Sequence, residues 1–227
     1  MILPLVLLFL TGASPSDGVE VLGWSPDGSR VVMLEHGIYD GKGTPWARVT
    51  FFDTAKRAVV GKPLEVELEG DASEADAVAE ATKRAEAQRV RLKLPKLVPG
   101  KRIKTDEKGE LTGADGGPIG NLEIKVTRAN KKQRARECAE PFQAELLSVK
   151  LFLMGGDEPL SVLTEKKTPA ARACSSGCTA GATFSQGKGA LFVLRCSVQG
   201  FEGAATQPFL VPVGKLEFPL EADLPPQ

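Results

Sequence analysis

The chain has 227 residues, of which 42% are hydrophobic and 26% charged, and these proportions suit one globular domain with a sizeable core. Its 29 basic and 29 acidic side chains balance each other. Because nucleic-acid-binding proteins usually carry a basic excess, we expect no nucleic-acid partner.

The N-terminus has the pattern of a secretory signal. Residues 2–10 form an apolar run that is too short to span a bilayer, which takes about 20 residues, and the small residues Thr11-Gly12-Ala13 offer a cleavage site. No Lys or Arg precedes the run, and a buried N-terminal strand is the alternative. We expect residues 1–18 to be a signal peptide, residues 19–227 to form a single secreted β-rich domain, and no segment to cross a membrane.

The first part of the domain is expected to be a meander of short strands. Residues 19–25 and 30–35 are rich in apolar and β-branched side chains and flank Ser25-Pro26-Asp27-Gly28. That sequence predicts a tight turn, because Pro presets φ and Gly accepts a positive φ. Further strands are expected at residues 48–53, 58–60 and 64–68.

One helix is expected near residues 73–93. Ser73 is a good N-cap, and Glu74 and Asp76 place negative charge in the first turn. The stretch is rich in good helix formers, but its apolar stripe is thin. The helix is therefore predicted to lie on the surface of the sheet. The face that it would present to the sheet is Ala77, Ala81, Ala85 and Gln88.

Glycine-rich turns divide the second half of the chain into further hairpins. Residues 95–118 are predicted to form a polar loop with room for one hairpin, and residues 128–137 a charged connection. Strands are expected at residues 119–127, 142–154, 160–164, 182–185, 190–197, 209–213 and 215–218. The predicted fold class is mainly β, with antiparallel β-hairpins in a sandwich or partial-propeller-like arrangement and one surface helix near residues 73–93.

A faint internal repeat relates two of these hairpins. A shift of about 160 positions aligns Trp24 with Phe184 and residues 31–34 with residues 191–194. The alternative interpretation is that any two hairpins of a β protein look alike.

The four cysteines lie in the C-terminal half and predict two disulfides, because the chain is expected to be exported. They are Cys138, Cys174, Cys178 and Cys196. A zinc site is disfavoured, since there is no second close pair of cysteines and the chain has one histidine, His36.

Three disulfide connectivities are open, and the last hairpin favours one of them. If that hairpin is centred on Gly187, residues whose numbers add to 374 face each other, which sets Cys178 opposite Cys196 at a distance that a disulfide accepts. Cys138 and Cys174 would then form the second bridge. A register slip of one residue would instead favour a Cys174–Cys178 bridge and leave Cys138 with Cys196.

Two resemblances to known proteins are visible. The segment WSPDGSR at residues 24–30 resembles the turn of TolB-type β-propeller blades, but one good copy and one degenerate copy are too few for a full propeller. The chain is also similar to DUF2259, a family of predicted secreted bacterial proteins. The shared features are the S-x-D-G turn at residues 25–28, Glu35, the G-x-x-D-G-x-G-x-P loop at residues 37–45, the G-x-P-x-x-V segment at residues 61–66, Cys174 and the GFEG segment at residues 200–203.

The resemblance to DUF2259 implies secretion and a β-rich fold, and it brings no activity. Lys42, Thr44 and Trp46 depart from the pattern of the family. The family also keeps cysteines near the positions of Cys138 and Cys174, which implies that these two pair.

The densest group of polar and aromatic residues surrounds the Asp-Gly loop. Glu35, Tyr39, Asp40 and Trp46 form a candidate binding loop, and Glu35 with His36 could serve as an acid–base pair. Asp40 could equally cap its own turn. No nucleophile, zinc-protease or phosphate-loop motif is present, so we expect no enzyme, no catalytic residue, no cofactor and no bound metal.

Two charged stretches have both a functional and a structural interpretation. Four acidic side chains lie in a Gly-rich segment: Asp106, Glu107, Glu110 and Asp115. They could bind calcium, but a solvated loop is the favoured interpretation. Six basic side chains follow one another closely along the chain: Lys125, Arg128, Lys131, Lys132, Arg134 and Arg136. They could bind an anionic envelope polymer, but a solvated connector is the favoured interpretation.

The sequence therefore predicts a secreted or periplasmic protein that is a structural module of the cell envelope or binds an envelope protein or ligand there. The alternative is an envelope hydrolase with an unrecognised active site. A third hypothesis is a docking protein that uses exposed loops around Tyr39 and Trp46.

The signal-peptide interpretation gives a testable result. We expect the mature chain to begin between Ser14 and Val19, because the small-residue cleavage region ends there. N-terminal sequencing of protein recovered from the medium or the envelope measures this. Intact Met1 on protein from the cytoplasm would contradict it.

Overall fold

The computed structural model describes residues 18–39, 42–113, 116–138, 142–200, 203–216 and 218, apart from the side chains of residues 171, 199, 200 and 203–205. The small sheet contains β1 (Gly18–Trp24), β2 (Arg30–Ile38), β3 (Pro45–Asp53), β4 (Ala58–Val59) and β5 (Leu64–Glu67). The helix α1 (Glu74–Arg91) follows. The large sheet contains β6 (Lys101–Thr105), β7 (Glu110–Thr112), β8 (Pro118–Arg128), β9 (Glu145–Leu153), β10 (Leu160–Thr164), β11 (Ser175–Gln186), β12 (Gly189–Gly200) and β13 (Gly203–Gly214), with the short 3₁₀ helix η1 (Ala170–Arg172) before β11.

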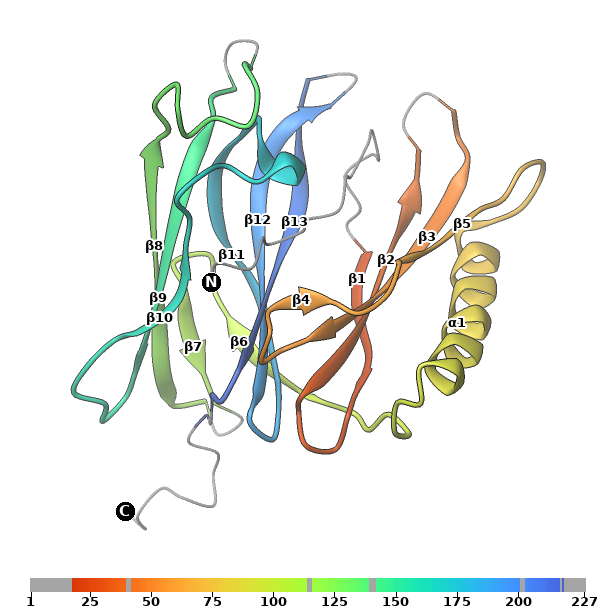
Figure 1. Ribbon diagram of the computed structural model, residues 1–227, viewed down its shortest axis with the longest axis horizontal. Helices are drawn as coiled ribbons and strands as arrows, with labels where there is room; N and C mark the ends of the chain where they lie inside the picture. Colours follow the sequence, from red (N-terminus) through yellow and green to blue (C-terminus); the bar gives the residue numbers. More distant parts are fainter. Residues whose placement is uncertain are drawn as a thin grey trace.

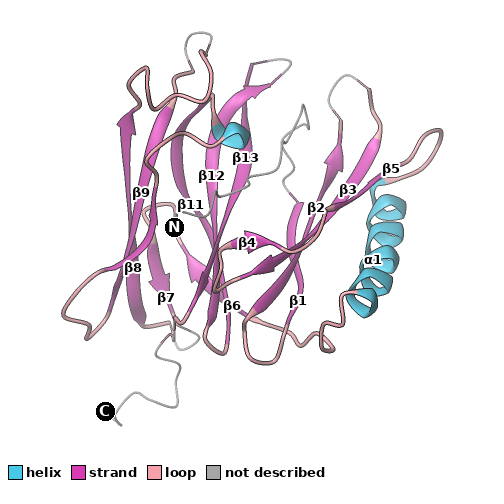
Figure 2. Ribbon diagram, viewed as in Figure 1, coloured by secondary structure: helices cyan, strands magenta, loops and turns pink. Residues whose placement is uncertain are grey.

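The elements form three layers, which are α1, the small sheet and the large sheet (Figure 1). All strand pairs are antiparallel, with the order β1-β2-β3-β4 in the small sheet, where β5 also pairs with β3, and β10-β9-β8-β7-β6-β11-β12-β13 in the large one. Figure 2 shows strands dominating the fold beside one long helix. The predicted fold class is confirmed.

Strand β2 is apolar on both sides because the small sheet is covered on both faces. Val32 and Leu34 face α1, whereas Val31 and Met33 on the opposite face pack with Leu191 of the large sheet. All four β2 side chains are at most 1% exposed. Successive side chains of a strand point to opposite faces, so a strand between two layers needs a continuous apolar run.

Helix α1 begins at the predicted N-cap and contacts the sheet through small residues. Ser73 Oγ accepts a hydrogen bond from the Asp76 backbone N–H, and the Asp76 carboxylate accepts one from the Ser73 backbone N–H, which completes a capping box. Ala77, Ala81 and Ala85 are buried against β2, β3 and β5. Their short side chains bring the helix close to the sheet, and the helix lies on the surface of the sheet, as predicted.

The large sheet curls until its edge strands β10 and β13 approach each other, which gives a nearly closed, barrel-like core. The turn between β3 and β4 reaches both of these edges. Arg57 Nη1 donates a hydrogen bond of 2.8 Å to the Val162 carbonyl of β10, and Ala55 lies against Gly214 at the end of β13. The small sheet therefore helps to hold the large sheet closed.

Two hairpin tips meet through glycine at the interface of the sheets. A Cβ added to Gly28 would lie 1.9 Å from the Gln186 carbonyl oxygen, and one added to Gly189 would lie 2.0 Å from the Gly28 carbonyl oxygen. The internal repeat aligns these two hairpins. In the first hairpin Trp24 lies opposite Val31, and in the second the aligned Phe184 lies opposite Leu191. The two hairpins pack tip to tip.

The structure joins Cys138 to Cys174 and Cys178 to Cys196. The second bridge depends on a β-bulge. Near the turn, Gln186 pairs with Gly189. If this register continued along the strands, Cys178 would not lie directly opposite Cys196. The ladder, however, shifts by one residue between Ala180 and Ala182. The shift sets the two cysteines directly opposite each other, with Cα atoms 4.0 Å apart.

Two details of the predicted strand pattern are wrong. The expected strand at residues 215–218 does not form among the described residues there, because Lys215 has φ of 60° and turns the chain after β13. Strand β11 begins at Ser175, well before the predicted residue 182, since its pairing with β12 continues past the bulge.

The glycine contact predicts a large difference between two substitutions. Gly28 and Gly43 have similar φ values of 72° and 64°, but a Cβ at Gly43 meets nothing within 4 Å. Gly43→Ala should cost about 1 kcal/mol of unfolding free energy from backbone strain alone, and Gly28→Ala at least about 3 kcal/mol because it also separates the hairpin tips. Urea unfolding measures both values, and equal costs would contradict the tip-to-tip packing.

Candidate functional site

A ladder of alternating charge crosses the small sheet. Glu35 of β2 lies directly opposite Arg48 of β3, and Arg48 lies directly opposite Glu65 of β5. Residues directly opposite in an antiparallel pair share one face of the sheet. Arg48 Nε donates a hydrogen bond of 2.9 Å to Glu65 Oε1, so the guanidinium lies between two carboxylates.

An aromatic pair lies beside this ladder. Trp46 of β3 is opposite Glu67 of β5 and, on the other side, opposite Gly37. Tyr39 packs against Trp46 with ring centroids 5.7 Å apart, and its hydroxyl donates a hydrogen bond of 2.8 Å to Glu67 Oε1. The two rows together form what we call the polar cluster: Glu35, Tyr39, Trp46, Arg48, Glu65 and Glu67.

The floor of the polar cluster is buried and its rim is exposed. Trp46 is 4% exposed, and Glu35 and Arg48 are each 6% exposed. Glu65 and Glu67 are exposed, and Lys42 places its ammonium 5.9 Å from the Tyr39 ring centroid. The cluster therefore exposes two carboxylates to solvent above side chains that solvent barely reaches.

Burial changes the acid–base properties of two members. Loss of hydration raises the pKa of Glu35; the Arg48 charge opposes this rise and Glu65 adds to it. Burial and the hydrogen bond to Glu67 raise the pKa of Tyr39 to about 12, so its hydroxyl remains a donor at neutral pH.

Two hydrogen-bond donors on the floor have no partner among the described residues. They are Trp46 Nε1 and Arg48 Nη1, and both are buried. A buried donor without a partner costs about 1–3 kcal/mol, and such groups often face a water molecule, an ion or a ligand. The polar cluster therefore combines free donors with exposed acceptors.

His36 belongs to a different site. It follows Glu35 along β2, so its ring lies on the opposite face, where Nδ1 is 2.5 Å from Glu74 Oε1 at the start of α1 and Nε2 is 3.6 Å from Glu20. The hydrogen bond between His36 and Glu74 anchors the helix N-terminus to the sheet. The structure thus separates the two residues of the candidate acid–base pair.

The candidate binding loop is only partly a loop. Glu35 and Trp46 are strand residues, which corrects the hypothesis that Trp46 sits in an exposed loop, because both faces of the small sheet are covered at β3. Tyr39 follows β2 and joins them. Asp40 lies outside the described residues.

The charged stretches take ordinary structural roles. Asp106 Oδ1 accepts the Glu110 backbone N–H at 2.8 Å in the β6–β7 turn, while Glu107 and Glu110 are exposed and Asp115 lies outside the described residues. Within the described part of the chain, no group of three or more His, Cys, Asp or Glu side chains could hold a metal ion. Lys125 pairs with Glu123 at 3.1 Å on β8.

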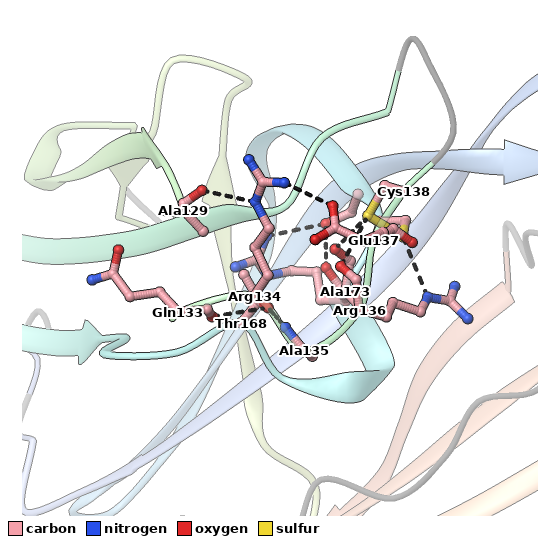
Figure 3. Close-up of a disulfide and its surroundings, with 12 residues drawn as sticks. Ala129, Gln133, Arg134, Ala135, Arg136, Glu137, Cys138, Thr168 and Ala173 are labelled. Atoms are coloured by element: carbon pink, nitrogen blue, oxygen red, sulfur yellow. Dashed lines mark hydrogen bonds and ion pairs between the residues drawn. A yellow bond between two sulfur atoms is a disulfide. The ribbon is translucent and has the colours of Figure 1, made fainter. Parts of the chain in front are cut away.

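Residues 129–138, which we call the basic connector, run from β8 to the first disulfide (Figure 3). Backbone contacts with Thr168 hold the middle of the connector, because Thr168 N–H donates to the Gln133 carbonyl at 2.9 Å and Ala135 N–H donates to Thr168 Oγ1 at 2.7 Å. Cys138 then bridges to Cys174, directly after η1 and Ala173.

A buried ion pair that the sequence did not reveal lies beside this disulfide. Arg172 bonds Glu165 through Nη2, and it also donates to the Glu145 carbonyl at 2.7 Å and to Ser175 Oγ at 3.0 Å. Burial raises the pKa of Glu165, and the Arg172 charge opposes the rise. The two residues are far from a recognisable motif, so no sequence signal could have found them.

A groove of about 340 Å³ lies next to the edge strand β1. Its lining is mainly apolar, with Arg102 over the Phe184 ring at 5.9 Å as its charged member. The other lining residues are Val21, Leu22, Leu97, Val98, Pro99 and Gly100.

The family model described as Predicted secreted protein (DUF2259) matches residues 32–214, which is most of the chain. The chain belongs to the DUF2259 family. Both disulfides fit the extracytoplasmic location of the predicted secreted proteins that this family model describes.

No curated protein and no solved structure gave a significant match to this DUF2259 protein. Of the helices in the described residues, none has the length and apolarity to cross a bilayer.

The raised pKa of Glu35 predicts a pH-dependent stability. The folded state binds this proton more tightly than the unfolded state, so the protonated carboxyl stabilises the fold below the unfolded pKa of about 4.3, and this contribution is lost as the pH rises through the folded-state pKa. Glu35→Gln stays neutral and should be more stable than wild type at pH 7 by on the order of 1 kcal/mol, with no gain at pH 3.5.

Urea unfolding at the two pH values measures the difference. The control is Glu110→Gln, an exposed side chain for which equal effects at both pH values are expected. A Glu35→Gln variant that loses stability at pH 7 would show that the attraction of Arg48 outweighs the burial of the carboxylate.

Proposed function

We propose that this secreted protein is a non-catalytic binding module of the cell envelope, and that the polar cluster contacts its ligand. The supporting observation is the pair of unsatisfied donors, Trp46 Nε1 and Arg48 Nη1, beside exposed carboxylates of β5. The fold holds these groups on adjacent strands, so they are positioned before a ligand arrives.

The chemistry of the cluster favours a ligand rich in hydroxyl groups. Its free indole and guanidinium N–H groups need acceptors, whereas the carboxylates of Glu65 and Glu67 need donors. A hydroxyl group supplies both. A simple anion is disfavoured, because the cluster has three acidic side chains, Glu35, Glu65 and Glu67, and one guanidinium, that of Arg48. We therefore propose a neutral saccharide of the envelope as the ligand class.

A non-catalytic role is supported by how the titratable groups are distributed. His36, the histidine of the chain, is held by Glu74 on the opposite face of the sheet and cannot act with Glu35. The four cysteines are paired in disulfides. The carboxyl groups of the cluster therefore have neither the histidine nor a cysteine thiol beside them.

One observation favours the envelope hydrolase as a second candidate. Burial raises the pKa of Glu35, whereas the Glu65 side chain is 56% exposed. A protonated and an ionised carboxyl group are the pair that acid–base cleavage of a glycosidic bond needs. Both proposals can therefore be tested with one saccharide.

The test uses chitotetraose, a neutral tetrasaccharide, with tryptophan emission as the signal. The chain has two tryptophans, and Trp24 is fully buried in the interface between the sheets. Binding should shift the emission of the wild-type protein in a saturable manner, and Trp46→Phe should abolish the shift while Trp24 still emits. Absence of a saturable shift in wild type would contradict saccharide binding.

Matched variants assign the contacts. Glu67→Gln should weaken binding several-fold, because it removes a charged acceptor on the rim, whereas Glu110→Gln on the distant β6–β7 turn should have no effect. Reducing ends released from chitotetraose by wild type, and not by Glu35→Gln, would favour the hydrolase over the binding module.

A further inference from the structure

The two disulfides have different surroundings. Cys178 and Cys196 are 6% and 1% exposed and lie in the core of the large sheet. Cys138, at the end of the basic connector (Figure 3), and its partner Cys174 are both partly exposed, so a dissolved thiol can approach them. Access is the first requirement for thiol–disulfide exchange, so the second pair is the candidate for it.

The two sulfur atoms of the exposed bridge differ in electrostatic environment. Arg136 Nε donates a hydrogen bond of 3.3 Å to Cys174 Sγ. The Ala173 carbonyl oxygen lies 3.1 Å from Cys138 Sγ, while the nearest carbonyl oxygen recorded for Cys174, that of Glu137, is 3.8 Å away.

Among the described residues, the nearest other charges do not cancel this asymmetry. The Glu137 carboxylate is held by Arg134 Nη1 at 2.8 Å. A negative charge on Cys174 would therefore face the Arg136 guanidinium. A negative charge on Cys138 would instead face two backbone carbonyl oxygens, that of Ala173 at 3.1 Å and that of Arg136 at 3.8 Å. A thiolate is favoured at Cys174, and a protonated thiol at Cys138.

We propose that the Cys138–Cys174 bridge is a thiol–disulfide exchange site at which an external dithiol attacks Cys138 and Cys174 is the leaving group. The attacking thiolate forms a bond to Cys138 Sγ while the Cys138–Cys174 bond breaks, and the electron pair goes to Cys174 Sγ beside Arg136. A cation beside the departing sulfur stabilises the thiolate that forms there and so speeds this step.

The second step completes the two-electron reduction. The second thiolate of the dithiol attacks the dithiol sulfur that is bonded to Cys138. The bond to Cys138 breaks, and the dithiol leaves as an internal disulfide. The two protons of the dithiol end on the released sulfurs or in solvent. The Cys138 thiol can then donate to the Ala173 carbonyl, whose oxygen is already 3.1 Å away.

Reduction would release one end of the basic connector. The bonds of Gln133 and Ala135 to Thr168 keep its middle in place. The segment that follows Ala135 has the disulfide as its covalent link to η1. The exchange therefore changes a local surface without opening the core.

The test maps which sulfur is attacked. The full secreted protein is treated with reduced glutathione, quenched with iodoacetamide and mapped by non-reducing peptide mass spectrometry. The expected early product carries glutathione on Cys138 and a carbamidomethyl group on Cys174, with Cys178–Cys196 intact. Glutathione on Cys174, or opening of both bridges at equal rates, would overturn the proposal.

Rate measurements with dithiothreitol test the role of Arg136. Arg136→Gln should slow reduction of Cys138–Cys174 about threefold, because it removes the charge that stabilises the leaving thiolate. Lys132→Gln removes an equal charge from a connector side chain that makes no ion pair with the described residues, and it should leave the rate unchanged. Equal rates for the two variants would show that Arg136 does not direct the reaction.

Discussion

The burial of the small sheet on both of its faces determines much of this structure. Because α1 covers one face and the large sheet packs on the other, β2 and β3 must present apolar side chains in both directions. This requirement explains the run Val31–Leu34, and it also explains why the helix uses alanines at the contact. It further gives the polar cluster its character, since Glu35 and Arg48 occupy positions on a face that is apolar at Val31 and Met33.

Closure of the large sheet depends on the same small sheet. An open sheet edge exposes unpaired backbone groups, and proteins protect such edges with prolines or covering segments. Both devices are present here. Strand β13 contains Pro208 and Pro212, which cannot donate to a further strand, and Arg57 binds the Val162 carbonyl on β10. The two sheets therefore form one unit, in which the β3–β4 turn lies against both edges of the curled sheet.

Local patterns predicted the elements well, and long-range contacts set the limits of the prediction. Ser73 and the acidic residues after it predicted the start of α1, because capping is a local interaction. The turn at residues 25–28 was equally readable. Cys178 and Cys196 were expected to face each other because their numbers add to 374. They do so only because a bulge near Gly181 shifts the register that begins at the turn, and nothing in the sequence shows where a bulge will form.

The candidate site was predictable in part for the same reason. Glu35, Tyr39 and Trp46 lie near one another in the sequence and do converge, whereas Arg48, Glu65 and Glu67 join them through strand pairing that a sequence does not display. His36, which the sequence offered as a possible acid–base partner of Glu35, lies on the opposite face, since adjacent residues of a strand point to opposite faces. The Glu165–Arg172 pair needs the packing of η1 against β9, so only the fold reveals it.

The contrast between the disulfides follows from the backbone that each one joins. Cys178 and Cys196 are separated by 18 residues within one hairpin, where the strand ladder already holds them together, so the bond mainly reduces the freedom of the unfolded chain. Cys138 and Cys174 are separated by 36 residues and join two segments that no strand ladder connects. Reducing the hairpin bridge would leave two thiols in the core, whereas reducing the connector bridge changes contacts at the surface. A chain that needs one permanent bridge and one reversible bridge would place them in this way.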